Sequence, residues 1–316
     1  MLNNPFIIFF LGLFLLIYGA DAIIDNSKKI ALKLNISKII IGITMVALGT
    51  SLPELVVSIF ATLKNENGII VGNIIGSNIA NIGLVLGVTA FLSPILIDLN
   101  LNRLRFNMTF LLLSTLALII GLLLNIINIF YGLLLIFLFL VYIYFLFKYF
   151  SKDDNKIKEN NFNINNYGLL YLFFFVFIGF FIVSLGSDFF IKGAIGISEY
   201  FGYKNNLVIS MTLVALGTSL PELATSIMAI KQGESNIALG NIIGSNIINI
   251  LLVVGLCGII SSDFSYEAIN ILPHLAILLF ITLALISIVL LYKKINRMAC
   301  LFFITLYIIF IYINFI

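Results

Sequence analysis

Residues 42–81 read GITMVALGTSLPELVVSIFATLKNENGIIVGNIIGSNIAN, and residues 210–249 read SMTLVALGTSLPELATSIMAIKQGESNIALGNIIGSNIIN. Aligned without gaps, the two segments are identical at 25 of 40 positions. A weaker match precedes them, where residues 18–21 (YGAD) face residues 185–188 (LGSD). The chain therefore contains one unit twice, and an internal repeat of this kind dictates the architecture of a protein.

The composition of the chain excludes whole classes of protein. Of 316 residues, 62% are hydrophobic and only 10% are charged, whereas an ordinary soluble domain carries about 25% charged residues. The chain lacks the polar groups to cover a soluble fold, which excludes a soluble enzyme, a nucleic-acid binder and a disordered protein. Cys257 and Cys300 lie in apolar runs without zinc or disulfide spacing, so we expect both to be buried as small hydrophobic residues.

Apolar runs long enough to cross a membrane, about 20 residues each, follow one another along the chain. The first run lacks the basic start and cleavage site of a signal peptide, so we expect it to remain as a helix. We predict an all-α polytopic membrane protein of ten transmembrane helices, at residues 5–25, 39–63, 69–92, 104–124, 127–150, 167–190, 206–230, 237–260, 270–291 and 297–316.

The polar segment 151–166 (SKDDNKIKENNFNINN) divides the chain into two halves of five helices, 1–150 and 167–316. If the N-terminus is outside, 14 of the 17 Lys and Arg residues fall in cytoplasmic loops. The positive-inside rule thus predicts a cell-membrane protein with both termini outside and a cytoplasmic central loop. Because five is odd, the second half enters the membrane from the opposite side, which makes an inverted repeat suited to alternating access.

Each repeat contains an interrupted helix, at residues 47–54 and 215–222, near the middle of its apolar run. Pro53 lacks the N–H that would bond the Gly49 carbonyl, and its ring crowds that carbonyl. We therefore expect free backbone carbonyls around residues 47–50. Within hydrocarbon, free carbonyls are tolerated only where they line a cavity or meet a ligand.

Glu54 and Glu222 occupy matching places in the two interruptions. One interpretation is a capping box, in which Ser51 and Glu54 restart the broken helix. The other is a functional carboxylate, because an acidic residue deep in the membrane costs at least ~2.5 kcal/mol and marks function by default. We favour the functional interpretation, with which capping is compatible.

The next helix of each repeat carries Ser77 and Asn81, or their twins Ser245 and Asn249, four residues apart on one face. Such carboxylate, hydroxyl, amide and carbonyl oxygens suit Ca²⁺, which takes six to eight of them. Two ionised glutamates match the charge of one Ca²⁺ or two Na⁺. The two kinds of ion would therefore compete for the same carboxylates, and such competition is the basis of exchange. Gly72 and Gly76 are small residues spaced four apart, which we expect to allow close helix packing. We expect the neighbouring amides to connect helices, at Asn73, Asn78, Asn241 and Asn246.

At these residues the chain resembles the cation/Ca²⁺ antiporter superfamily, most closely the prokaryotic Na⁺/Ca²⁺ exchangers. The two GTSLPE and two GNIIGSN blocks correspond to that family's repeats, and the resemblance extends over both halves. It implies a core formed by spans 2, 3, 7 and 8, across which the long, tilted spans 1 and 6 slide as a gate. It also implies ion ligands at Glu54, Glu222, Thr50, Thr218, Ser51, Ser219, Ala47, Ala215, Ser77, Ser245, Asn81 and Asn249.

The resemblance leads us to expect Ca²⁺ and Na⁺ as transported ions, no cofactor, no nucleic acid and no required protein partner, with function as a monomer. Some relatives have Asp in place of Asn249, and the absence of that Asp puts a role for protons and the number of ions in doubt. The proton-coupled calcium antiporters, which have different glutamate motifs, remain an alternative. The potassium-dependent branch has a further Asp that is absent here between Gly240 and Gly255. A passive channel using the same ligands is a weaker alternative, and an enzyme is disfavoured. Asp21 and Asp188 could line the ion path or lie at the membrane interfaces.

Overall fold

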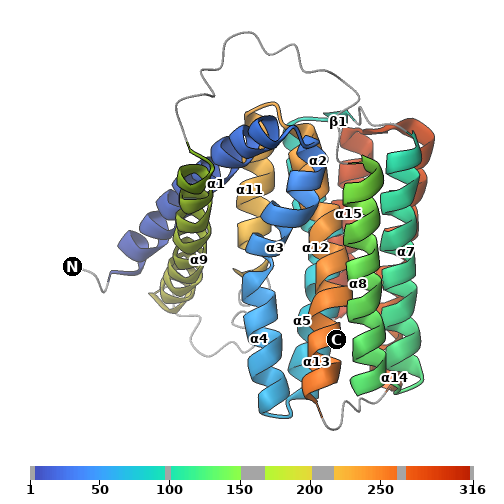
Figure 1. The fold of residues 1–316 in the computed structure, drawn as a ribbon. Helices are drawn as coiled ribbons and strands as arrows, with labels where there is room; N and C mark the ends of the chain where they lie inside the picture. Colours follow the sequence, from blue (N-terminus) through green and yellow to red (C-terminus); the bar gives the residue numbers. More distant parts are fainter. Residues whose placement is uncertain (1–3, 97–100, 151–167, 201–216, 262–267, 314–316) are drawn as a thin grey trace.

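The computed structural model describes residues 4–96, 101–150, 168–200, 217–261 and 268–313, and this part of the chain is almost entirely helical (Figure 1). The central segment 151–166 and Ala215 lie outside the described residues. The first half comprises α1 (Pro5–Leu34), α2 (Lys38–Ile41), the π-helix η1 (Gly42–Val46), α3 (Ala47–Thr50), α4 (Leu52–Leu63), α5 (Asn67–Ala80), the π-helix η2 (Asn81–Leu86), α6 (Gly87–Leu92), α7 (Leu101–Leu123) and α8 (Ile129–Phe150).

The second half repeats much of this order. It comprises α9 (Leu169–Tyr200), α11 (Leu220–Lys231), α12 (Ser235–Ile248), the π-helix η4 (Asn249–Val254), α13 (Gly255–Ile260), α14 (Ala268–Tyr292) and α15 (Arg297–Ile313). Two short strands, β1 (Ile95–Leu96) and β2 (Lys294–Ile295), pair in antiparallel register.

Each of the ten predicted apolar runs overlaps a helix in the described part of the chain. Within the described residues, seven helices are long and apolar enough to cross a membrane, or eight if the bent pair Lys38–Thr50 and Leu52–Leu63 is one span. The 17-residue helix α15 is shorter but also apolar. The chain is thus a polytopic helical membrane protein.

The predicted interruption of the second span is present. Its two parts meet at Ser51 with a bend of 46°, and Pro53 lies in the first turn of α4. The expectation of free carbonyls is wrong for Ala47, whose carbonyl accepts the Ser51 N–H at 3.0 Å and the Thr50 hydroxyl at 3.4 Å. Proline removes only its own N–H, so the helical bonding pattern continues as far as Ser51.

Two π-helical turns occur at matching places that the sequence pattern does not predict. One begins at Asn81 and the other at Asn249, both expected site residues. A π-turn inserts extra backbone into a helix and is frequent at functional sites.

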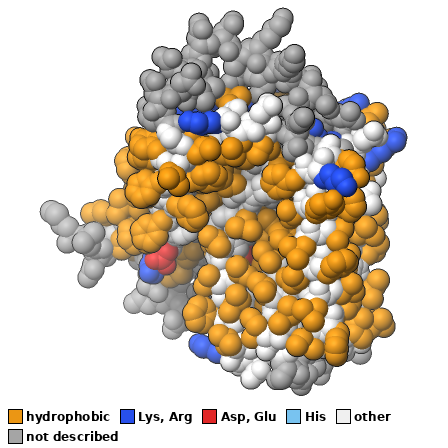
Figure 2. Space-filling model, in the orientation of Figure 1, with side chains coloured by type: hydrophobic (Ala, Val, Ile, Leu, Met, Phe, Trp, Pro, Cys, Tyr) orange, Lys and Arg blue, Asp and Glu red, His pale blue; other side chains and the backbone are white. Residues whose placement is uncertain are grey.

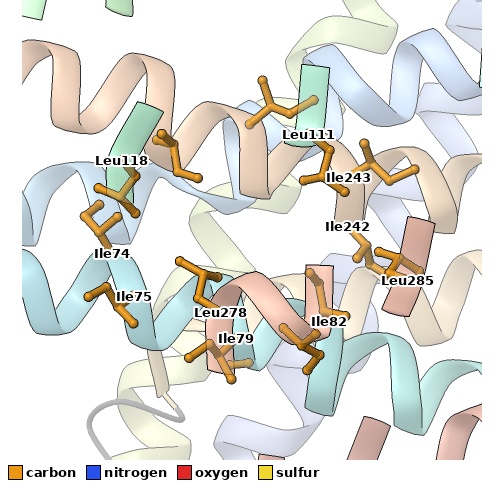
Figure 3. Packing of buried hydrophobic residues seen from close by; sticks show 14 of the residues in the cluster. Ile74, Ile75, Ile79, Ile82, Leu111, Leu118, Ile242, Ile243, Leu278 and Leu285 are labelled. Carbon is orange, nitrogen blue, oxygen red and sulfur yellow. The ribbon is translucent and has the colours of Figure 1, made fainter. Parts of the chain in front are cut away.

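Packing divides the apolar interior into two clusters. The larger joins α5, η2, α7, α12 and α14, with Ile74, Ile79, Leu118, Ile243 and Leu278 among its members (Figure 3). The smaller joins α1, α9 and α11 to parts of α2, η1 and α12. The long helices α1 and α9 thus pack mainly with each other and with one edge of the bundle, beside the upright helices of Figure 1.

Glycines allow the close approach of α1 and α9. A Cβ atom on Gly186 would lie 2.8 Å from the Leu16 backbone nitrogen, and one on Gly19 would lie 2.9 Å from the Val183 nitrogen. Both helices extend beyond the predicted runs 5–25 and 167–190, to Leu34 and Tyr200. The apolar criterion missed the extension of α1 because it is polar, although several of its polar residues are buried.

Large hydrophobic side chains cover much of the outside of the molecule (Figure 2). Phe130 on α8 and Leu170 on α9 are among the most exposed of them. A surface of this kind is expected where lipid is the solvent.

The matching helices α4 and α11 end at opposite ends of the molecule. In Figure 1, α4 ends at the bottom, whereas α11 ends at the top beside the junction of α1 and α2. The ion pairs of Glu234 with Lys28 and Lys38 confirm the position of the α11–α12 connection. The strand β1 also lies at the top.

Candidate functional site

The two repeat carboxylates, Glu54 and Glu222, are both completely buried at 0% exposure. Glu54 lies in the first turn of α4 and Glu222 in the first turn of α11. Ser51, at the start of the helix that carries Glu54, bonds the Glu222 carboxylate at 3.0 Å, so Glu222 lies against the bend that precedes Glu54. Two buried carboxylates repel each other when both are ionised, so a nearby positive charge would stabilise the pair.

Hydroxyl groups from both repeats converge on Glu222. Ser51 donates to its Oε1 at 3.0 Å from the first repeat, and Ser245 donates to the same atom at 3.4 Å from the second. We call the interruption at Ser51, and the matching place at Ser219, the joint of each repeat. The joint of the first repeat therefore lies against the Glu222 carboxylate of the second.

A second contact between the repeats lies one helix away. The Asn249 amide nitrogen donates to the Ser77 hydroxyl at 3.1 Å. Asn81, the twin of Asn249, is fully buried at the start of the η2 turn. The four expected residues of the third and eighth predicted spans thus face the interior.

Several oxygens of this group have no hydrogen-bond partner among the described residues. They are both carboxylate oxygens of Glu54, Glu222 Oε2, Ser219 Oγ, Asn81 Oδ1 and Asn249 Oδ1. Buried polar atoms are normally paired, because an unpaired one costs the desolvation free energy without return. All six can accept, although the Ser219 hydroxyl is also a donor, and the Asn81 amide nitrogen is an unpaired donor in the same group. The carboxylate and amide carbonyl oxygens are acceptors only, and a hard cation fits them. They are oxygen donors of the kind that Ca²⁺ and Na⁺ prefer over the softer His and Cys ligands of zinc or copper.

An outer layer of amides holds the backbone of each glutamate. Asn73 donates to the Glu54 carbonyl at 3.0 Å and to Ser58 at 2.9 Å. Asn241 donates to the Glu222 carbonyl at 3.4 Å and accepts a bond of 3.1 Å from the Thr50 hydroxyl. These amides connect helices, as predicted, but they do so directly behind the carboxylates.

The sequence pattern did not identify three hydroxyls of this outer layer. They are Ser58, which bonds Asn73, and Thr225 and Ser226, which accept from Asn241 at 3.1 Å each. Ser58 and Ser226 are identical at matching places in the repeats. That identity at a polar position was the signal that could have found these two serines, whereas Thr225 aligns with Val57 and gave no such signal.

The capping-box interpretation is wrong. Ser51 and Ser219 stand at the N-cap positions of α4 and α11, but neither side chain makes a capping bond. The Ser51 hydroxyl bonds Glu222 instead, and the Glu54 carboxylate has no hydrogen-bond partner among the described residues. Because the two repeats face each other, the Ser51 hydroxyl meets the carboxylate of the other half, which a local sequence pattern does not show.

The close helix packing expected at Gly72 and Gly76 is not seen within the described residues, whereas the matching Gly244 of the second repeat is closely packed. A Cβ on Gly244 would lie 2.8 Å from Ala47 Cβ. No described atom lies within 4 Å of a Cβ on Gly72 or Gly76.

The remaining expected residues have varied positions. Thr218 is half-buried beside the joint, and Ala215 lies outside the described residues. Asn78 and Asn246 bond carbonyls of their own helices, at Ile74 and Ile242.

The two matching aspartates of α1 and α9 make contacts away from the glutamates. Asp21 accepts a bond from Gln232 at 2.8 Å, and Asp188 pairs with Lys192 at 2.6 Å. These polar partners favour the interface interpretation over the ion path. Cys257 and Cys300 are buried and free, as predicted. Among the described residues, no group of three or more His, Cys, Asp or Glu side chains gathers to hold a metal.

Comparison with known proteins gives consistent matches over nearly the whole chain. The family model described as "Sodium/calcium exchanger protein" matches residues 4–148 and 171–316. The sodium/calcium exchanger MaX1 of Methanosarcina acetivorans is 33% identical over 297 residues, which cover 82% of this chain and 84% of the relative. An uncharacterized membrane protein of Methanocaldococcus jannaschii is 39% identical over 303 residues, or 95% of each chain. A solved structure of the sodium-calcium exchanger NCX_Mj matches with a TM-score of 0.81, at 34% identity and 98% coverage of both chains.

Proposed function

The chain belongs to the sodium/calcium exchanger family, and on that premise we propose that it is a secondary antiporter exchanging Na⁺ for Ca²⁺ by alternating access. The transported ions are its substrates, and the proposal includes no cofactor. The exchanger NCX_Mj, which the chain resembles along its length, was studied after soaking with 2.5 mM Na⁺ and 0.1 mM Ca²⁺. The family is one of transporters rather than enzymes.

The buried carboxylate pair carries the proposal. Both carboxylate oxygens of Glu54 and one of Glu222 are buried without a hydrogen-bond partner among the described residues, in a chain that spans the membrane. Intramembrane carboxylates are costly and mark ion pathways. One Ca²⁺ or two Na⁺ would neutralise the two charges equally well. The two ions therefore compete for one site, and this competition couples their transport.

The proposed ligands come from both repeats. Glu54 and Glu222 are the main ligands of Ca²⁺ and Na⁺, because they alone supply full negative charge. The hydroxyls of Ser77 and Ser245 and the amide oxygens of Asn81 and Asn249 complete the centre. The joints contribute further oxygens through Thr50, Ser51, Thr218, Ser219, Ala47 and Ala215. The Ala47 carbonyl already accepts two bonds, so its role is the weaker one.

The proposed architecture is two inverted five-helix halves, residues 1–150 and 167–316, joined by a cytoplasmic linker at 151–166. The opposite directions of α4 and α11 support this arrangement. Alternating access then follows from symmetry, since each half can adopt the conformation of the other. The helices α1 and α9, packed on each other through glycines, slide together across the remaining helices as the gate.

The proposed location is the cell membrane of a prokaryote, with ten spans and both termini outside. The orientation rests on the distribution of Lys and Arg. The pairing of β1 with β2 supports the number of spans between them, because it brings together two loops that are predicted to lie on the same side of the membrane. The site is built within one chain, so we propose that a monomer is sufficient for transport.

Uptake of radiolabelled Ca²⁺ into Na⁺-loaded proteoliposomes tests the proposal. We expect uptake to require an outward Na⁺ gradient and to fall as external Na⁺ rises. Uptake that ignores Na⁺ but follows a pH gradient would instead show a proton-coupled antiporter. The neutral Asn249 disfavours that outcome, because an amide cannot carry a proton at this pH. Uptake driven by the Ca²⁺ gradient alone would indicate a channel.

A further inference from the structure

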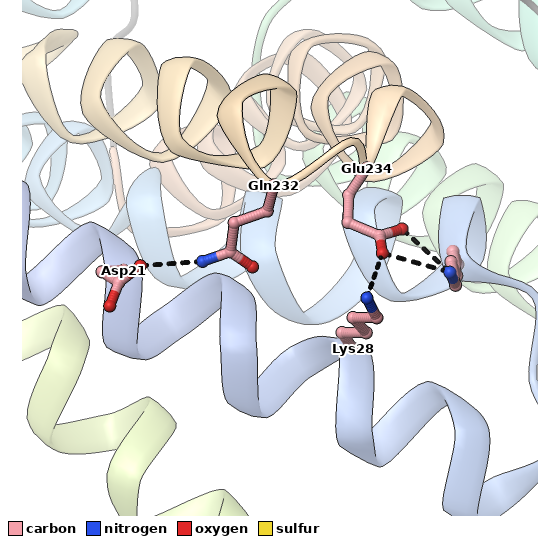
Figure 4. Close-up of polar contacts among 5 residues, drawn as sticks. Asp21, Lys28, Gln232 and Glu234 are labelled. Atoms are coloured by element: carbon pink, nitrogen blue, oxygen red, sulfur yellow. Dashed lines mark hydrogen bonds and ion pairs between the residues drawn. The ribbon is translucent and has the colours of Figure 1, made fainter. Parts of the chain in front are cut away.

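A buried ion-pair cluster lies at the end of the molecule where α11 turns into α12. Glu234, in that connection, is only 5% exposed. Its carboxylate pairs with Lys28 of α1 at 2.9 Å and with Lys38, the first residue of α2, at 3.0 Å (Figure 4). One carboxylate thus joins three separate segments of the chain.

A second bond attaches the same connection to α1. The Gln232 amide donates to Asp21 at 2.8 Å (Figure 4). Asp21 and Lys28 are seven residues apart, or about two helical turns, so they lie on one face of α1. The α11–α12 connection therefore holds α1 at two points along its length.

Among the described residues, the matching place in the first repeat lacks this cluster. Glu66 aligns with Glu234, but Glu66 is exposed. The positions that match Lys28 and Lys38 at the repeat offsets are Ile195 and Asn206, which carry no charge. The same glutamate is therefore kept in both repeats, but only one copy has the two lysines in its repeat-related partner positions.

A difference of this kind matters in a molecule with two related conformations. If the halves were identical, closing either end of the ion path would cost the same free energy. A contact that forms only when one end is closed stabilises the state closed at that end. The equilibrium shifts by the difference in the free energy of that contact between the two states. Partly buried charges contribute more than exposed ones, because solvent and salt screen them less.

We propose that Glu234, Lys28 and Lys38 form a latch that fixes α1 to the α11–α12 connection and biases the exchanger toward the state closed at that end. The latch rests on the proposed function, which supplies the sliding of α1 and α9. In the proposed orientation this end is cytoplasmic, so the favoured state opens to the outside. These residues position the gate and do not contact the transported ions.

Distances between spin labels on the full-length protein in lipid nanodiscs test the latch. One label is placed on the gate through Leu34→Cys and the other on α7 through Arg105→Cys, both at exposed positions. Cys257→Ala and Cys300→Ala remove the natural thiols. We expect Glu234→Gln to change the ratio of the two distance populations by about tenfold, which corresponds to about 1.4 kcal/mol.

Two kinds of variant make the test specific. Lys28→Gln and Lys38→Gln each leave Glu234 with one lysine, so each should shift the populations less than Glu234→Gln. They also keep the test informative if Glu234→Gln does not fold. Glu66→Gln is the matched control from the other repeat and should leave the wild-type distribution unchanged.

The latch is overturned if Glu234→Gln, Lys28→Gln and Lys38→Gln all keep the wild-type distribution, or if Glu66→Gln shifts it as much. The label distances require no transport. If Glu234→Gln shifts the distances but the wild-type protein shows no Na⁺-dependent Ca²⁺ uptake, the latch is supported and the proposed function is refuted. If the wild-type protein exchanges the ions but Glu234→Gln gives no shift, the reverse holds.

Discussion

The Ser51 hydroxyl of the first repeat donates a 3.0 Å hydrogen bond to Glu222 Oε1 of the second. Neither repeat therefore completes the carboxylate site by itself. The Asn249 amide adds a second link of the same kind by donating to Ser77 at 3.1 Å. The consequences of a site built across two halves can be measured.

Removing either carboxylate charge should stop exchange. We expect Glu54→Gln and Glu222→Gln each to lower Na⁺-dependent Ca²⁺ uptake by more than about 100-fold, since even outer-layer changes cost about 10–100-fold in metal affinity. Uptake into proteoliposomes is the measurement. Glu66→Gln removes an exposed carboxylate and is the control. Normal uptake by both site variants would refute the site.

The hydrogen-bond partners of Glu222 should affect ion affinity more than folding. We expect Ser51→Ala and Asn241→Ala to weaken Ca²⁺ binding by about 10–100-fold, because they lose bonds to Glu222. Ca²⁺ titration of purified protein measures this. Ser114→Ala and Asn107→Ala are matched controls, since Ser114 bonds its own helix and Asn107 bonds Tyr142. Equal losses in the controls would indicate a general packing effect.

The two copies of the repeat should be accessible from opposite sides. Lys64 and Lys231 are exposed at the ends of α4 and α11. In intact cells, a membrane-impermeant maleimide should label Lys64→Cys and should label Lys231→Cys only after the membrane is opened. Labelling of both from outside would contradict the inverted arrangement.

The glycine contact between α1 and α9 should be intolerant of bulk. In Gly186→Leu, the new side chain would meet the α1 backbone at Leu16. Overpacking typically costs about 1–3 kcal/mol, so we expect a lower Tm for the variant in thermal unfolding. Gly168→Ala, with no described atom within 4 Å of its Cβ, should leave the Tm unchanged. A wild-type Tm for Gly186→Leu would show that the helices separate freely.

The sequence predicts the parts of the site that depend on local pattern. Pro53 marks the broken helix, and the repetition of Glu54 as Glu222 singles out the carboxylates. The bond from Ser51 to Glu222 was not predictable, because the spacing of Ser51 and Glu54 also fits a capping box within one repeat. Only the folding of one half against the other brings Glu222 nearer. The pairing of Glu234 with Lys28 was missed for the same reason, as 206 positions separate the two residues in the sequence.

The contacts of Ser51 with Glu222 and of Asn249 with Ser77 also constrain how such a chain could have arisen. If the two halves are inverted, a protein with only one of them would need a second molecule inserted upside down to assemble the same pocket. Such a precursor would have had to enter the membrane in both orientations. If each copy has an odd number of spans, fusing two copies places them in opposite orientations within a single polypeptide.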